Sequence, residues 1–217
     1  MDEQRSTVTV PVGDARLTAD VTLPAQPVGV VLFAHGSGSS RHSPRNVAVA
    51  RTLNDSGLGT VLADLLTPAE DEIDARTAEL RFDIGLLASR LVGIVDWLGV
   101  ERPAGDVPIG LFGASTGAAA ALVAAASRAD RVRAVVSRGG RPDLAGNALT
   151  QVRAPTLLLV GGSDEEVLTL NERAVAELGP VGEVRVVAGA THLFEESGTL
   201  EQVAAEAATW FVTHLRR

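Results

Sequence analysis

The chain contains no cysteine, no lysine and no tyrosine, and it has a single methionine. Without cysteine there is no disulfide, no thiolate nucleophile and no zinc site built on thiolates. Without lysine there is no Schiff-base chemistry and no phosphate-binding lysine of a P-loop. Any covalent chemistry must therefore use other side chains.

Long apolar runs are also missing. No run approaches the ~20 residues that a transmembrane helix needs, and the stretch Met1-Asp2-Glu3-Gln4-Arg5 lacks the apolar core of a signal peptide. We therefore expect a cytoplasmic location and no membrane partner. The net charge of −8 at pH 7 argues against nucleic acid as a partner, because phosphates would be repelled. The sequence leaves homo-oligomerisation open.

Short apolar segments alternate with longer amphipathic ones along all 217 residues. Runs rich in β-branched residues predict strands, most of them buried on both faces as in a parallel sheet. The predicted strands are 7–11, 16–23, 28–34, 61–63, 107–112, 132–136, 156–160 and 184–187. The predicted helices are 44–55, 81–98, 116–128, 165–178 and 199–215, the last opening with Thr199 and Gln202 in capping-box spacing. The acidic stretch 70–74 is interpreted as a solvated loop or a helix start. This order predicts one α/β domain spanning 1–217, with a mostly parallel sheet.

Between a predicted strand and a predicted helix lies Gly113-Ala114-Ser115-Thr116-Gly117, a G-x-S-x-G pattern. A serine at such a strand–turn–helix junction has its hydroxyl pushed out at the top of the sheet, and the glycines let the backbone crowd the turn. Ser115 is therefore the candidate nucleophile. A serine hydroxyl is almost never ionised at neutral pH, so it requires a base.

Four histidines are candidates for that base. His192 follows the last predicted strand, which places it on the same rim of the sheet as Ser115, and it is our choice. His35 leads a glycine–serine loop and is interpreted as structural. His42 lies in a polar loop, and His214 belongs to the last helix.

The third member of a triad should be a carboxylate on a rim loop between nucleophile and base. Asp164 stands at the end of strand 156–160 and is the choice, since the order Ser, Asp, His is the usual one for this motif. Asp143 also follows a strand and is the competitor. Asp64 precedes Ser115 and would break the order. Glu165 and Glu166 are expected to face solvent in the first turn of a helix.

Two backbone N–H groups are expected to form an oxyanion hole. One belongs to Thr116, the residue after the nucleophile. The other comes from the loop after strand 28–34, where Ser37 is the choice and Gly36 or Gly38 are alternatives. A dinucleotide-binding reading of Gly36-Ser37-Gly38 fails, because Arg41 occupies the last glycine position of that fingerprint.

Four segments in this order resemble the α/β-hydrolase superfamily, within it the compact dienelactone-hydrolase-like branch. They are His35-Gly36-Ser37-Gly38, Gly113-Ala114-Ser115-Thr116-Gly117, Gly161-Gly162-Ser163-Asp164 and Gly189-Ala190-Thr191-His192. The resemblance implies an eight-stranded sheet whose second strand is antiparallel to the rest. Dienelactone hydrolases proper use a cysteine where this chain has Ser115. Only residues 137–154 separate two strands where many relatives carry a helical cap, so no large cap is expected.

Arginines flank the predicted rim loops, among them Arg41, Arg45, Arg138 and Arg141. One pair could bind a substrate carboxylate through a bidentate fork. The interpretation we favour is ordinary surface arginine in a chain that has no lysine. Phe194 is a candidate wall of the acyl or alcohol pocket, whereas Trp97 and Trp210 fit apolar helix faces in the core.

These residues predict a serine hydrolase that cleaves small carboxylic esters and needs no metal or organic cofactor. Thioester or amide cleavage and perhydrolysis would use the same triad. A binding protein of the same fold is the alternative from another class, since a fold does not fix a function.

Overall fold

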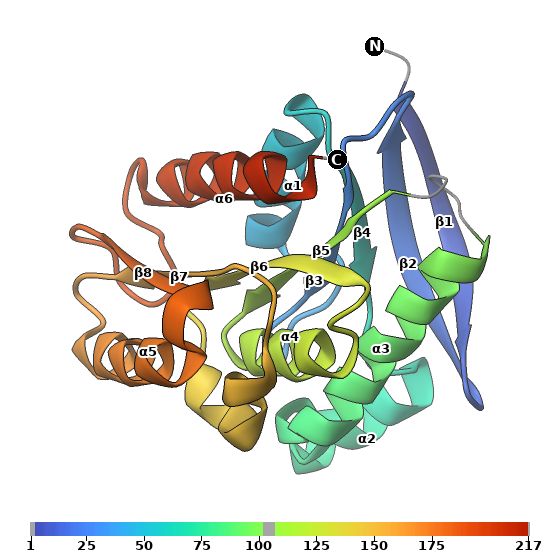
Figure 1. Cartoon of the computed structure of the whole chain (residues 1–217). Helices are drawn as coiled ribbons and strands as arrows, with labels where there is room; N and C mark the ends of the chain where they lie inside the picture. The colour runs from blue at the N-terminus through green and yellow to red at the C-terminus, as the bar shows by residue number, and fades with distance from the viewer. Residues whose placement is uncertain (1–2, 102–106, 217) are drawn as a thin grey trace.

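The computed structural model describes residues 3–101 and 107–216. Its centre is an eight-stranded sheet with the order β1-β2-β4-β3-β5-β6-β7-β8 (Figure 1). The strands are β1 (Glu3–Val12), β2 (Ala15–Pro24), β3 (Val30–Ala34), β4 (Gly59–Ala63), β5 (Ile109–Ala114), β6 (Val132–Arg138), β7 (Thr156–Gly161) and β8 (Gly182–Val187). Strand β2 runs antiparallel to both of its neighbours, and the pairs from β4 to β8 are parallel. The predicted fold class, the α/β-hydrolase fold, is confirmed.

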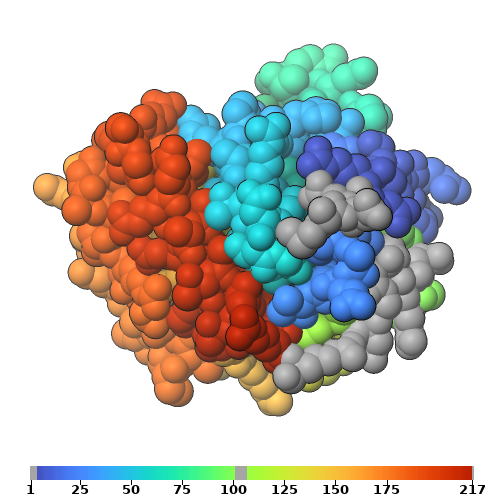
Figure 2. All heavy atoms as spheres, turned by 90° about the horizontal axis from the view of Figure 1, so that it is seen from above, coloured from blue at the N-terminus to red at the C-terminus, as the bar shows by residue number. Residues whose placement is uncertain are grey.

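Helices cover both faces of this sheet (Figure 1). Helices α1 (Pro44–Asp55) and α6 (Thr199–Leu215) lie side by side on one face (Figure 2). Helices α3 (Ile84–Glu101), α4 (Thr116–Ser127) and α5 (Glu165–Leu178) cover the other, and α2 (Pro68–Thr77) lies at the end of α3. The segment between β6 and β7 holds only the short 3-10 stretch η2 (Pro142–Gln151), so there is no cap domain.

Side chains along the buried strands point alternately to the two faces of the sheet, so the core has two halves. On β3, Leu32 faces the α3/α4 side while Phe33 faces the α1/α6 side, and both are buried. The Phe33 and Phe112 rings lie 4.9 Å apart on neighbouring strands. Full burial of one such side chain stabilises a fold by about 1.5–3 kcal/mol. Strands buried on both faces therefore hold the loops at their carboxyl ends on a rigid base.

Two predictions about helix starts need correction, and the helix-start alternative for residues 70–74 is confirmed. The helix expected from residue 81 begins at Ile84, after the 3-10 turn η1 (Leu80–Phe82). Helix α6 has no capping box, because its N-cap is Gly198 and the Thr199 hydroxyl donates to the Glu196 carbonyl. The acidic stretch 70–74 lies within α2, whose N-cap Thr67 forms the capping box with Glu70.

Candidate active site

Ser115 occupies a strained turn between β5 and α4. Its φ of 50° and ψ of −123° are unusual for a residue with a side chain, and such a conformation costs about 1–3 kcal/mol. Backbone hydrogen bonds hold it there: the Ser115 N–H donates to the Arg138 carbonyl, and the Ser115 carbonyl accepts from the N–H groups of Ala118 and Arg141. The turn places the serine, half-buried, at the carboxyl end of the sheet.

Both glycines of the pattern are required by close packing. A Cβ on Gly113 would lie 2.4 Å from the Ala118 Cα, and one on Gly117 would lie 2.4 Å from the Ala34 carbonyl oxygen. Neither backbone contact could accommodate a methyl group. The glycines let α4 and the loop after β3 approach Ser115, as the pattern predicts.

His192 and Asp164 form a direct pair. The distance from His192 Nδ1 to Asp164 Oδ2 is 2.7 Å. Asp164 follows β7 at the start of α5, and the Ser163 N–H donates to the Ala190 carbonyl, which fixes its loop against the histidine loop. With Nδ1–H donating to the carboxylate, Nε2 is left as the acceptor that a general base needs.

The segment from Arg138 to Arg141 connects the serine with this pair. On one side it makes the backbone hydrogen bonds to Ser115 described above. On the other, a Cβ on Gly139 would lie 3.1 Å from the His192 carbonyl oxygen and 3.7 Å from the His192 Cε1. The three predicted triad residues thus come from the ends of β5, β7 and β8 around one short segment.

The competing residues have other partners. His35 Nδ1–H donates to the Gly36 carbonyl and His35 Nε2 accepts from the Leu65 N–H, and burial lowers its pKa. His214 stacks on Trp210, with ring centroids 4.4 Å apart. Asp143 forms a bidentate pair with Arg141, and Asp64 accepts from Arg41.

The two residues expected to supply the oxyanion hole are in contact, in a way that the sequence did not predict. The Ser37 N–H donates to the Thr116 side-chain oxygen at 3.0 Å. A Cβ on Gly36 would lie 3.2 Å from the Ser115 Cβ, so the loop after β3 passes directly beside the serine. The Thr116 hydroxyl therefore has a partner in this loop, in addition to the N–H for which Thr116 was chosen. The only sign of this contact in the sequence is that Thr116, directly after Ser115, carries a hydroxyl group.

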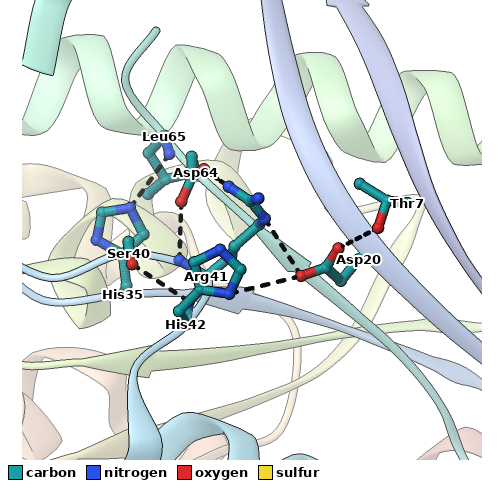
Figure 3. Close-up of polar contacts among 8 residues, drawn as sticks. All are labelled: Thr7, Asp20, His35, Ser40, Arg41, His42, Asp64 and Leu65. Carbon is teal, nitrogen blue, oxygen red and sulfur yellow. Dashed lines mark hydrogen bonds and ion pairs between the residues drawn. The ribbon is translucent and has the colours of Figure 1, made fainter. Parts of the chain in front are cut away.

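Arg41 is the centre of a polar cluster beside that loop (Figure 3). Its guanidinium forms ion pairs with Asp64 and Asp20, and its N–H donates to Asp64. A cleft of about 880 Å³ opens here, lined by the loop after β3, by the end of β4 and by α2. Its lining residues include His35, Arg41, Asp64, Asp71 and Arg81.

Arg138 and Phe194, the other expected substrate contacts, lie on the α1/α6 side. Phe194 is buried in the core cluster of that side and has a φ of 55°. A Cβ on Gly139 would lie 3.2 Å from the Phe194 ring. Arg138 is 9% exposed, and its Nη2 donates to Asn46 Oδ1 at 3.4 Å.

Within 3–101 and 107–216, histidine, aspartate and glutamate side chains form no group of three that could hold a metal ion. None of the helices in these ranges has the length and apolar character to cross a membrane.

The sequence matches the family model of the α/β hydrolase fold over residues 29–161. The chain belongs to this family. It is a dienelactone-hydrolase-like member: the crystal structure of a dienelactone hydrolase from Anabaena variabilis is 55% identical, with a TM-score of 0.97 and 99% coverage of both chains. Est1E from Butyrivibrio proteoclasticus, at 17% identity, 96% coverage of this chain and 98% of its own, shares the fold with a TM-score of 0.77.

Two curated proteins from strains of Mycobacterium tuberculosis are 56% identical to this chain over 208 residues. Both carry the name of a phosphoribosyl transferase. The match covers 96% of this chain but 46% of each relative. The chain therefore spans about half the length of the curated relatives that it matches.

Proposed function

We propose that this chain is a serine hydrolase that cleaves small carboxylic esters through an acyl-enzyme on Ser115. The observation that carries the proposal is the 2.7 Å contact between His192 Nδ1 and Asp164 Oδ2. Ser115 lies in a strained strand–helix turn, and the segment 138–141 packs against both this turn and the His192 loop. A base oriented by a carboxylate and a nucleophile at such a turn are the parts that acyl transfer requires.

In the proposed reaction, His192 Nε2 takes the hydroxyl proton as Ser115 Oγ attacks the ester carbonyl carbon. Asp164 orients the imidazole and stabilises its positive charge. The tetrahedral oxyanion is held by the Thr116 N–H and by the Ser37 N–H, which keeps its hydrogen bond to the Thr116 hydroxyl and gains the oxyanion as a second acceptor. His192 then protonates the leaving alcohol, and water hydrolyses the acyl-enzyme by the same route.

The surroundings of the site favour small substrates. The segment between β6 and β7 is short, so no cap encloses a long acyl chain. In this proposal, Phe194 supports the pocket floor beneath Gly139. Arg41 shapes the cleft beside the loop after β3, where Asp20 and Asp64 already balance its charge. The dienelactone hydrolase relative supports hydrolysis, whereas the transferase name belongs to proteins about twice as long.

The same triad would serve thioester or amide cleavage and perhydrolysis, and a binding protein would need no reactive serine. The test is labelling with a fluorophosphonate together with turnover of p-nitrophenyl acetate. Wild-type protein should react with both, and Ser115→Ala should lose the label and about 10³-fold or more of turnover. Ser127→Ala, at the other end of α4, is the matched control and should behave like wild type. An unlabelled, inactive wild-type protein would favour the binding protein.

A further inference from the structure

Arg138 is a buried cation that lacks a counter-charge. Its Nε and Nη1 atoms are inaccessible to solvent and have no hydrogen-bond partner. Its Nη2 reaches only the neutral amide oxygen of Asn46, at a long 3.4 Å. Burial first, and the charge of Arg45 second, lower the pKa of Arg138 to about 10, so the group is still cationic at neutral pH. A buried charge in this state is costly unless something pairs with it.

The other rim arginines that the sequence singled out are all paired. Arg41 binds Asp20 and Asp64, Arg45 binds Glu195, and Arg141 binds Asp143. Within the described ranges 3–101 and 107–216, Arg138 has no carboxylate partner. The explanation by ordinary surface arginine therefore holds for its neighbours and fails for Arg138.

The N-terminus of α1 adds to the positive charge at this place. Asn46, the partner of Arg138, lies in the first turn of this 12-residue helix. An acidic residue in that turn would be favourable, but α1 has none there and carries Arg45 instead. Two guanidinium groups and the positive end of a helix thus meet near the end of β6, the strand that pairs with the strand leading to Ser115.

We propose that Arg138, with Asn46 and Arg45, binds an anionic oxygen-rich group, a carboxylate or a phosphoryl group, on the ester that Ser115 attacks. This inference rests on the proposed function and names the substrate class of the same site. The anion would satisfy the unpaired Arg138 nitrogens by charge-assisted hydrogen bonds. It would also relieve the repulsion between Arg138 and Arg45. The main chain of Arg138 lies beside Ser115, since the Arg138 carbonyl accepts from the Ser115 N–H.

Entry to Arg138 is proposed to pass the Arg45–Glu195 ion pair. The Arg45 side chain is 30% exposed and that of Glu195 is 65% exposed, with Nη2 and Oε1 2.8 Å apart. Such an exposed pair is weak and opens readily. An arriving anion would replace Glu195 on Arg45 and the Asn46 amide on Arg138.

The first test measures binding without turnover. Inorganic phosphate and acetate are titrated into the protein at constant ionic strength, and thermal unfolding is followed. A ligand that binds only the folded state stabilises it by RT ln(1 + [L]/Kd), so the Tm rises as the anion concentration rises. We expect at least one of the two anions to raise the Tm of wild type, and the comparison of the two identifies the preferred group. No rise with either anion would overturn the proposal.

Asn46→Asp is the decisive variant, because it places a carboxylate beside Arg138. It should fold, since it completes an ion pair and puts an acidic residue in the first turn of α1. We expect it to unfold at a higher temperature without ligand and to lose the response to anions. Arg141→Gln is the matched control, since it removes a rim guanidinium that is already paired, and it should respond like wild type. An equal response in wild type and Asn46→Asp would place the anion elsewhere and reject the proposal.

The second test measures selectivity among esters. Phenyl acetate is neutral, p-nitrophenyl hemisuccinate carries a carboxylate and 4-acetoxyphenyl phosphate carries a phosphoryl group. For each protein, kcat/KM on an anionic ester is divided by kcat/KM on the neutral ester. We expect this ratio to be about tenfold or more higher in wild type than in Asn46→Asp for one of the anionic esters. Equal selectivity in the two proteins would reject the anion site while leaving the esterase proposal intact. Wild type that cleaves no ester but still binds anions would reject the esterase and keep the site.

Discussion

The Ser37 N–H donates to the Thr116 side-chain oxygen at 3.0 Å, joining two segments that lie 79 residues apart in the chain. This hydrogen bond ties the loop after β3 to the first turn of α4. The same loop is anchored on its other side by His35, whose Nε2 accepts from the Leu65 N–H after β4. The loop that carries the Ser37 N–H is therefore held from two sides.

Removal of the Thr116 hydroxyl should slow the chemical step. Thr116→Val keeps the shape of the side chain but leaves the Ser37 N–H without its acceptor, and one hydrogen bond of this kind contributes about 1 kcal/mol. We expect kcat on p-nitrophenyl acetate to fall about fivefold to tenfold, with little change in KM. Thr116→Ser retains the hydroxyl and should restore most of the rate. If the valine variant matches wild type, the Thr116 hydroxyl has no part in positioning Ser37.

Asp164 should be required for catalysis through its charge. Asp164→Asn keeps the size of the side chain but favours the wrong histidine tautomer, as known for serine proteases, where the loss in kcat is about 10⁴-fold. We expect a loss of the order of 10³-fold to 10⁴-fold in kcat, with the melting temperature little changed. Glu165→Gln, one residue further on and exposed, serves as the control. A full loss of activity in the control, or unchanged activity in Asp164→Asn, would contradict the assigned role.

His35 should make stability depend on pH on the acidic side of neutrality. Burial lowers its pKa, although the Gly36 carbonyl and Asp64 partly oppose this, and the protonated ring could not accept from Leu65. A histidine whose pKa is lower in the folded state stabilises the fold fully above the unfolded value of about 6.5. This stability is lost as the pH falls from there through the folded pKa.

The measurement for His35 is the free energy of unfolding between pH 7.5 and 5, by urea denaturation. We expect a decrease toward pH 5 in wild type and a smaller slope in His35→Gln, whose amide can still accept from Leu65. His42→Gln is the control, because it removes an exposed imidazole 4.0 Å from the Asp20 carboxylate and leaves the buried His35 in place. Its slope should stay closer to that of wild type than the slope of His35→Gln does. Equal slopes in all three proteins would contradict the assignment.

The sequence predicted those parts of the fold that depend on local pattern. Helices 44–55, 165–178 and 199–215 have the predicted bounds, since each carries an apolar face between clear start and stop signals. Helix α2 was not predicted as a full helix, because its acidic segment has almost no apolar face. It is instead stabilised by the Thr67–Glu70 capping box and by the ion pair of the buried Asp74 with Arg81. Contacts of this kind are not visible as periodicity.

For the candidate site, the order of residues along the chain predicted which side chains meet. It did not predict the surroundings of each side chain. Asp164 and His192 were chosen because both follow parallel strands, whose carboxyl ends share one rim, and their side chains do meet. The isolation of Arg138 depends on where every neighbouring acid points, which no local pattern encodes. Strand alternation does predict that Arg138 lies on the same side of β6 as Val136. Because β6 is buried on both faces, however, alternation could not tell whether this arginine is buried or lies at the rim.

Gly117 should tolerate no side chain. A Cβ there would lie 2.4 Å from the Ala34 carbonyl oxygen and 2.5 Å from that of His35, both backbone atoms at the start of the loop after β3. We expect Gly117→Ala to lower the free energy of unfolding by about 1–3 kcal/mol, typical of overpacking. Activity should fall further than stability explains, because the displaced backbone leads directly to Ser37. The control is Gly85→Ala in α3, where the new methyl group would meet only the Asp83 side chain and alanine favours the helix by up to about 1 kcal/mol. The free energy of unfolding by urea and the rate of ester turnover are measured for both variants. If Gly117→Ala is as stable and as active as Gly85→Ala, the close approach of α4 to this loop is not needed.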